Sequence, residues 1–200
     1  MIEYKIEMGS FIGGWFIDKK ICDNIISHFK NTPSFYKVSG KTYGGKKFFE
    51  TIPKKSTELV IEPNLRKPPF DLYEDNLQKC LNLYTKKYEG AKRLSRYGLM
   101  GKYNIQHYKP GEGFYEFHCE RAGWEYSDRQ FVFMTFLNDV KDGGTIFKYQ
   151  NLTVPAKKGL TLIWPTDWTH LHKGQISKKH EKYIVTGWLH FVKGEPSSVG

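Results

Sequence analysis

Cysteine is scarce in this sequence, and no long apolar run is present. The three cysteines, Cys22, Cys80 and Cys119, are odd in number and widely spaced, and no C-x-x-C pair occurs. This pattern argues against a disulfide framework or a cysteine-ligated zinc site and indicates a reducing, cytoplasmic environment. No stretch approaches the roughly 20 apolar residues that cross a bilayer, and charged residues occupy the amino-terminal segment where a secretory signal would lie. We therefore expect no membrane association.

Acidic residues are also in short supply. Against 31 lysines and arginines the chain has 21 aspartates and glutamates, a formal charge of +10 at pH 7. The first 100 residues contain 18 of the basic and 11 of the acidic residues, so most of the surplus lies in that half. Such a charge favours an anionic partner, whether nucleic acid, an acidic protein surface or a small polycarboxylate, and does not distinguish among them.

The 200 residues contain no internal repeat and no linker rich in proline, glycine or serine. Aromatic residues make up 16% of the chain, which excludes the disordered and low-complexity classes. We therefore expect one domain over residues 1–200. Within it, residues 1–98 form a supporting region of helices and a β-hairpin, residues 99–192 form the β core, and residues 193–200 are a tail.

Two helices are predicted in the first half. The first begins after Asp18 and ends before Pro33, and its apolar face consists of Ile21, Ile25, Ile26 and Phe29. The second begins with a capping-box pattern at Asp71 and Glu74 and ends at Gly90. Its apolar face consists of Leu77, Leu81, Tyr84 and Tyr88.

The segment 37–55, between these helices, is basic and aromatic and is predicted to form an exposed hairpin that turns at Gly44-Gly45. From about residue 100 the pattern changes to short strands separated by turns, which is typical of a sandwich or barrel. The predicted strands are 102–108, 115–120, 130–137, 145–149, 160–164, 169–173 and 182–191. Helices followed by strands give an α+β class in which the helices brace one face of the β unit.

A candidate metal site lies in the segment Tyr115–Glu120. His118 and Glu120 are two residues apart, so on a strand both side chains leave the same face. An imidazole and a carboxylate are common ligands of divalent transition metals, and a third ligand completes a facial triad with open positions. The strand predicted at 169–173 offers two candidates, His170 and His172, which also share a face.

Lys182 opens the strand KYIVTGWLHF and shares its face with Ile184, Thr186 and Trp188. On this alternation the lysine points with apolar residues, and a buried ammonium needs an anionic partner because leaving it unpaired is costly. A dicarboxylate cosubstrate would supply that partner. The alternative is a lysine that reaches water from the strand end.

The order of motifs over residues 100–192 resembles the prolyl 4-hydroxylase-like family of iron(II)- and 2-oxoglutarate-dependent dioxygenases. The segments 108–111 (YKPG) and 118–120 (HCE) resemble the family's Y-x-x-G and H-x-D elements, with glutamate in place of the usual aspartate. The segments 136–140 (FLNDV) and 143–147 (GGTIF) resemble Y-L-N-D-V and G-G-x-T-x-F, with one residue missing after the glycines. The segment 172–174 (HKG), the lysine ten residues after His172 and the tryptophan six residues further on match the last elements.

The resemblance implies a double-stranded β-helix, which is a jelly-roll or cupin-like barrel, with the N-terminal helices packed on one sheet. It implies that the catalytic Fe(II) is held by His118, Glu120 and His172. His172 is preferred to His170 because it opens H-x-G and lies ten residues before the lysine. The residues implied to bind the cosubstrate are Lys182, Tyr108, Thr145 and Trp188.

By the same resemblance, we expect hydroxylation of a C–H bond, coupled to conversion of 2-oxoglutarate and O2 into succinate and carbon dioxide. Ascorbate is a supporting reductant in this expectation. The expected acceptor is a prolyl residue of a peptide or protein, with a preference for an acidic one because the first half is basic. Its binding site is expected along the hairpin 37–55 and the loop 121–129, with Arg121, Trp124 and Tyr126 as lining residues.

Other acceptors and one other class of protein remain open. A free amino acid or a nucleic-acid base would use the same chemistry. Related base-directed oxygenases have R-x-x-x-x-x-R near the last strand, whereas this chain has no arginine after Arg129, which disfavours nucleic acid. The alternative from another class is a cupin-type metal-binding barrel that is non-catalytic or independent of 2-oxoglutarate. The oligomeric state is not predicted.

Overall fold

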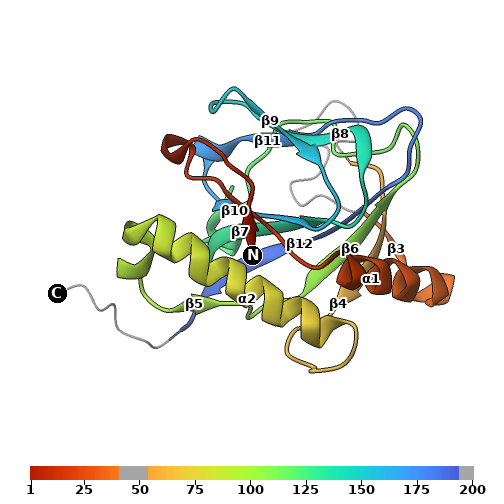
Figure 1. Ribbon diagram of the computed structural model, residues 1–200, viewed down its shortest axis with the longest axis horizontal. Helices are drawn as coiled ribbons and strands as arrows, with labels where there is room; N and C mark the ends of the chain where they lie inside the picture. Colours follow the sequence, from red (N-terminus) through yellow and green to blue (C-terminus); the bar gives the residue numbers. More distant parts are fainter. Residues whose placement is uncertain (41–53, 194–200) are drawn as a thin grey trace.

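The computed structural model describes residues 1–40 and 54–193. A large antiparallel sheet faces a small one, and two helices, α1 (Lys19–Asn31) and α2 (Phe70–Lys87), lie against the outer face of the large sheet (Figure 1). The expected jelly-roll fold and the packing of the helices on one sheet are both confirmed.

Among the described residues, the large sheet has nine strands and the small sheet has three. The strands are β1 (Ile2–Glu3), β2 (Gly13–Phe16), β3 (Val38–Ser39), β4 (Thr57–Ile61), β5 (Tyr97–Gly98), β6 (Tyr103–Tyr108), β7 (Arg129–Phe136), β8 (Val140–Phe147), β9 (Leu152–Ala156), β10 (Leu160–Pro165), β11 (His172–Gly174) and β12 (Lys182–Phe191). In the large sheet the order is β1-β2-β10-β7-β12-β6-β4-β3, with β5 paired to β12, and in the small sheet it is β11-β8-β9. The part of the chain that the structure describes also contains five short 3-10 helices: η1 (Met8–Ser10), η2 (Ser34–Tyr36), η3 (Glu89–Arg93), η4 (Trp124–Tyr126) and η5 (Trp168–His170).

Side chains on the two faces of β12 belong to two separate hydrophobic cores. Tyr183, Val185 and Leu189 join the core between the large sheet and the helices. Ile184 belongs to the core inside the barrel, and Trp188 packs against that core. Because successive side chains of a strand face opposite sides, the predicted shared face of Lys182, Ile184 and Trp188 is confirmed.

The first helix begins and ends where the sequence predicts. The Asp18 carboxylate accepts a hydrogen bond from the Lys20 N–H over 2.8 Å, which satisfies one of the unpaired donors of the first turn. The Thr32 N–H closes the last turn on the His28 carbonyl. The buried residues of this helix are Ile21, Ile25 and Phe29, as predicted, and Cys22, which was not predicted. The predicted Ile26 is only partly buried and packs against the same core.

The capping box predicted for the second helix is wrong. Pro69 occupies the N-cap position, and no side chain caps the helix there. Glu74 is buried and binds tertiary partners instead, because its carboxylate accepts from the Asn64 N–H over 3.1 Å and from the Tyr103 hydroxyl over 3.0 Å. The helix also ends before the predicted Gly90, which lies in η3.

Two of the predicted strands are wrong where the metal site was expected. Residues 115–120 form no strand, and only an isolated bridge joins His118 to His172. Residues 168–170 form η5, so His170 and His172 do not share a strand face. The sequence pattern also missed β9 and the N-terminal strands of the large sheet, among them β2 and β4.

Most of the predicted hairpin 37–55, including its Gly44-Gly45 turn, lies outside the described residues. Of its flanks, Val38–Ser39 forms β3, which pairs with β4 at the end of the large sheet. Within the described ranges, no helix has the length and apolar character needed to cross a bilayer.

Candidate metal centre

Two segments that are distant in sequence meet at His118 and His172. The His118 N–H donates to the His172 carbonyl over 3.0 Å, and the His172 N–H donates to the His118 carbonyl over 2.9 Å. Directly opposed residues of an antiparallel pair project to the same side, so both imidazoles face one point and their ring centroids lie 4.4 Å apart. This single bridge therefore positions both histidines, which the sequence pattern predicted to lie on two full strands.

Glu120 reaches the same point from a backbone held elsewhere. Its N–H donates to the Thr166 carbonyl over 3.0 Å. One carboxylate oxygen, Oε1, lies 3.4 Å from His118 Nε2 and 3.6 Å from His172 Nε2. Among residues 1–40 and 54–193, this trio is the cluster whose ligand atoms all lie within 4.8 Å of one another.

The other nitrogen of each imidazole is already bonded. His118 Nδ1 lies 3.1 Å from the Glu116 carbonyl oxygen, and His172 Nδ1 lies 2.9 Å from the His170 carbonyl oxygen. A carbonyl oxygen only accepts, so each Nδ1 carries a proton, and each Nε2 would present its lone pair to a bound metal. Metal-ligating histidines are oriented in this way in most protein sites.

The electrostatics of the cluster also suit a cation. Burial lowers the pKa of His118, and the neighbouring His172 lowers it further. Burial by itself would raise the pKa of the Glu120 carboxyl, but interaction with His118 and His172 holds it well below its ordinary value. Neutral imidazoles and an ionised carboxylate are the protonation states in which these groups bind a metal, so the residues fit Fe(II) or a similar divalent ion.

Aromatic rings surround the two histidines, and the sequence patterns missed them. Phe114 stacks on His118 with centroids 3.5 Å apart and planes 10° from parallel. Trp164 on β10 meets His172 edge-on at 5.0 Å, and Phe147 on β8 lies 5.8 Å from it. Trp164 and Phe147 follow from strand alternation once the barrel interior is known, but Phe114 lies in a loop and gives no periodic signal.

His170, the other histidine considered as a ligand, faces away from this cluster. It is buried, and its Nε2 donates to the Ser10 carbonyl over 3.0 Å. Its Nδ1 lies 3.0 Å from the Thr169 hydroxyl. Nε2 thus attaches η5 to the N-terminal segment, and Nδ1 is engaged within η5.

Lys182 is buried inside the barrel, with 6% of its surface exposed. Its ammonium donates to the neutral carbonyl of Gln175 over 3.2 Å and lies 5.0 Å from the centre of the Tyr108 ring. Burial lowers the pKa of Lys182 to about 8. A positive group in this setting gains from an anionic ligand, as the alternation predicted.

Tyr108 and Thr145, two of the residues expected to bind cosubstrate, lie on strands that border Lys182. Tyr108 on β6 pairs with Lys182 on β12, and its hydroxyl donates to Gln106 over 2.5 Å. Thr145 on β8 is buried and pairs with Gly174 on β11. A Cβ atom on Gly174 would stand 3.3 Å from the Lys182 ammonium, so the glycine leaves the space around that group clear.

Trp188, the fourth of these residues, lies beside the metal ligands. Its indole N–H donates to the second carboxylate oxygen of Glu120, Oε2, over 2.9 Å. The guanidinium of Arg129 lies over the Trp188 ring at 3.6 Å and over the Tyr126 ring at 4.3 Å. Sequence reasoning overlooked Arg129, which opens β7 and carries no motif.

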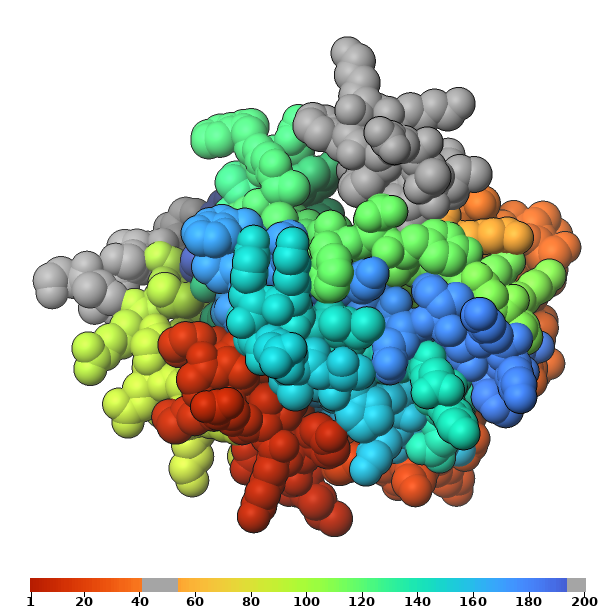
Figure 2. Space-filling view, turned by 90° about the horizontal axis from the view of Figure 1, so that it is seen from above, coloured from red at the N-terminus to blue at the C-terminus, as the bar shows by residue number. Residues whose placement is uncertain are grey.

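The three residues expected to line the substrate site are spread along the loop before β7. Arg121 forms an ion pair with Asp167, with 2.5 Å between Nη2 and Oδ2. Trp124 projects into solvent with 87% of its surface exposed, and Tyr126 packs on Arg129. Figure 2, which views the molecule from the side of the small sheet, shows the segment near residue 120 beside those near residues 145–150 and 170–180.

The expectation that Lys54 belongs to an exposed basic surface is wrong. Lys54 is buried and forms an ion pair with Glu58 on β4, whose carboxylate also accepts from the Ser56 hydroxyl over 2.8 Å. Its backbone pairs with Phe114, and its ammonium lies 5.9 Å from the centre of the Phe114 ring. Lys55 remains exposed.

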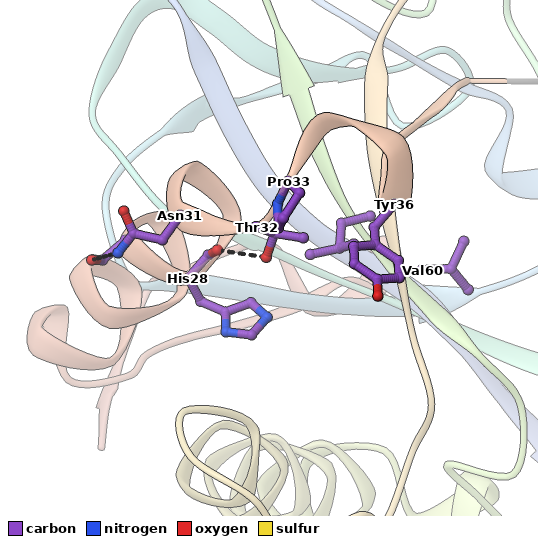
Figure 3. Close-up of a pocket in the computed structure, with 8 residues that line it drawn as sticks. His28, Asn31, Thr32, Pro33, Tyr36 and Val60 are labelled. Carbon is purple, nitrogen blue, oxygen red and sulfur yellow. Dashed lines mark hydrogen bonds between the residues drawn. The ribbon is translucent and has the colours of Figure 1, made fainter.

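Two surface hollows flank different parts of the molecule. One, of about 400 Å³, is lined by residues that include Lys173, Gly174 and Gln175 and therefore adjoins Lys182. The other, of about 620 Å³, lies between the end of α1 and β4, with His28, Thr32, Tyr36 and Val60 in its lining (Figure 3). None of the metal-site residues lines this second hollow.

Comparison with known proteins agrees with the fold. Residues 103–190 match the 2OG-Fe(II) oxygenase superfamily. No curated protein matches the chain significantly. The viral collagen prolyl hydroxylase of Paramecium bursaria Chlorella virus-1, in its 2-oxoglutarate complex, is 18% identical, with a TM-score of 0.66 over 91% of this chain and 97% of the other.

Two further prolyl hydroxylases have similar folds. The Pseudomonas putida prolyl-4-hydroxylase is 14% identical, with a TM-score of 0.64 over 90% of this chain and 92% of the other. The Trichoplax adhaerens prolyl hydroxylase, in complex with a hypoxia inducible factor peptide fragment, is 12% identical, with a TM-score of 0.65 over 90% of this chain and 84% of the other.

The matched segment contains all three members of the cluster and Lys182. This segment is similar to the 2-oxoglutarate- and Fe(II)-dependent oxygenases, and the fold of the chain is that of the prolyl hydroxylases. The match to this superfamily implies Fe(II), 2-oxoglutarate and O2 as the reacting set.

Substitution of His172 and of His170 distinguishes a metal ligand from a histidine that only stabilises the fold. We expect His172→Ala to weaken Co(II) binding by at least about 100-fold, because it removes one lone pair aimed at the cluster. The matched variant His170→Ala is expected to lose thermal stability and to retain Co(II) binding, since both of its nitrogens are bonded elsewhere. Isothermal titration of both proteins checks this, and equal metal affinity in the two variants would contradict the ligand assignment.

Proposed function

We propose that this protein hydroxylates a prolyl residue of a peptide or protein, with Fe(II) held by His118, Glu120 and His172. The observation that carries the proposal is the convergence of these three ligand atoms in a barrel that also buries the ammonium of Lys182. The iron supplies oxidation of an unactivated C–H bond when it is bound.

The roles of the protein side chains follow from their positions. The Nε2 atoms of His118 and His172 and Oε1 of Glu120 bind the metal on one side. Lys182 pairs with the distal carboxylate of 2-oxoglutarate, and this pairing orients the 2-oxo acid end toward the metal. Tyr108 and Thr145 border the same space and restrict how the cosubstrate lies in it.

The peptide acceptor is supported by the fold rather than by a residue of the site. The structurally similar proteins named above are prolyl hydroxylases, and the Trichoplax adhaerens protein is seen with a peptide fragment. The formal charge of +10 favours an acidic peptide. We place the acceptor beside Arg121, Trp124 and Tyr126, on the loop next to Glu120.

We also propose a cytoplasmic location and a supporting role for ascorbate. All three cysteines are unpaired thiols, and Cys22 and Cys80 are buried, which suits a reducing compartment. Ascorbate would return iron to the ferrous state during repeated turnover.

The test is turnover of proline-containing peptides under defined conditions. Protein purified anaerobically is loaded with Fe(II) and given 2-oxoglutarate, O2, ascorbate and a set of acidic and basic peptides. Succinate and a mass gain of one oxygen on an acidic peptide are expected, and His172→Ala is expected to give neither. Succinate without any peptide product would reject the peptide acceptor, and no succinate at all would reject the oxygenase.

The binding of the cosubstrate should depend on pH through Lys182. Its pKa of about 8 means that the ammonium is present below pH 8 and is lost as the pH rises through that value. We therefore expect the affinity for the 2-oxoglutarate analogue N-oxalylglycine to fall above pH 8, approaching about tenfold per pH unit. Calorimetry with the Fe(II)-loaded protein from pH 7 to pH 10 measures this.

Lys182→Arg is the control for this titration. A guanidinium keeps its charge over the whole range, so the variant is expected to bind N-oxalylglycine with little change between pH 7 and pH 10. If wild-type affinity does not change over this range either, Lys182 does not bind the dicarboxylate.

A further inference from the structure

The metal-binding carboxylate of this chain belongs to a glutamate, and its two oxygens have different surroundings. Oε1 faces the two histidines, at 3.4 Å from His118 Nε2 and 3.6 Å from His172 Nε2. Oε2 faces the opposite way, where it accepts the indole N–H of Trp188 over 2.9 Å. Arg129 Nη1 lies 3.8 Å from the same oxygen.

Arg129 is itself held in place from three directions. Its guanidinium lies over the rings of Trp188 and Tyr126, at 3.6 Å and 4.3 Å from their centres. Its Nη1 donates to the backbone carbonyl of Glu120 over 3.1 Å. Arg129 therefore contacts both the backbone and the carboxylate of Glu120, and it stacks on the indole that donates to Oε2.

A glutamate needs such support more than an aspartate would. Its additional methylene adds one freely rotating bond, and each side-chain rotor that must be ordered for ligation reduces the binding free energy. Trp188 is well suited to limit this freedom, because it lies on β12 at the centre of the large sheet and its ring is packed against the barrel core.

We propose that Trp188 and Arg129 are positioning residues that hold Oε2 of Glu120 and so aim Oε1 at the metal, an arrangement matched to glutamate. The proposal rests on the proposed metal site and adds to it a specific reason why glutamate serves here. We name these two residues the Glu120 clamp.

The clamp should be of no use to an aspartate. Shortening the side chain by one carbon–carbon bond withdraws the carboxylate by about 1.5 Å, so an aspartate that reaches the metal cannot also accept the Trp188 indole N–H. The contributions of Trp188 and Glu120 to metal affinity are therefore expected to be coupled rather than additive.

The experiment is a double-mutant cycle on the affinity for Co(II), a redox-stable probe of the site, measured by isothermal titration. Trp188→Phe removes the indole donor and keeps an aromatic ring for Arg129. We expect it to weaken Co(II) binding by about 10-fold or more with Glu120 present, and by less than about twofold in the Glu120→Asp background. Trp168→Phe, at an exposed tryptophan of η5, is the matched control and should leave the affinity unchanged.

Thermal unfolding shows whether the Trp188→Phe variant is folded. If it is not, Arg129→Lys tests the same positioning role. A lysine keeps the charge and loses the planar group that stacks on both rings, so weaker Co(II) binding is expected with Glu120 and not with Glu120→Asp. Equal losses in both backgrounds would overturn the clamp and leave the proposed function standing. Absence of Co(II) binding by the wild-type protein would overturn both.

Discussion

The pair of backbone hydrogen bonds between His118 and His172 is the contact on which the site depends. It connects the loop before β7 to the first residue of β11, and it sets two imidazoles side by side without a continuous strand on either segment. The Nδ1 atoms of both rings then bind carbonyls of their own segments, so the direction of each Nε2 is fixed by the backbone. A metal ion would find its ligands already oriented, which lowers the ordering cost of binding.

The barrel around this pair contains a buried anionic group and a buried cationic group at different places. At one end, Glu120 remains ionised despite its burial because the two imidazoles face it. Further along β12, Lys182 is buried against a neutral carbonyl, and its pKa is lowered accordingly. A bound cation would compensate the first group, and a bound dicarboxylate would compensate the second. A cosubstrate that chelates the metal with one end and carries a carboxylate at the other satisfies both requirements at once.

The parts of the fold that follow from local patterns were predictable from the sequence. Helix α1 was found because Asp18 and the spacing of Ile21, Ile25 and Phe29 all indicate the same element. β12 was found with its inward face because Lys182, Ile184 and Trp188 fall on one side of an extended strand. The capping box at Glu74 failed because its carboxylate is bound by Asn64 and Tyr103, which are distant contacts that no local pattern contains.

The site was predictable to a similar extent. Spacing alone left His170 and His172 as alternatives, and only the order of motifs favoured His172. The roles of Phe114 and Arg129 could not be predicted, because each acts through a partner brought close by the fold: His118 for Phe114, and Trp188 for Arg129. The prediction that Lys54 is exposed was wrong for the same reason, because its ion-pair partner Glu58 is buried with it.

We propose that one barrel holds a metal at His118, Glu120 and His172 and a dicarboxylate at Lys182. A crystal structure of the protein with Mn(II) and N-oxalylglycine tests it most directly, because the metal can be located by anomalous scattering. We expect one Mn(II) within bonding distance of both Nε2 atoms and Oε1 of Glu120, with the distal carboxylate of the analogue on the Lys182 ammonium. A metal bound to other residues, or a distal carboxylate that does not contact Lys182, would contradict the account.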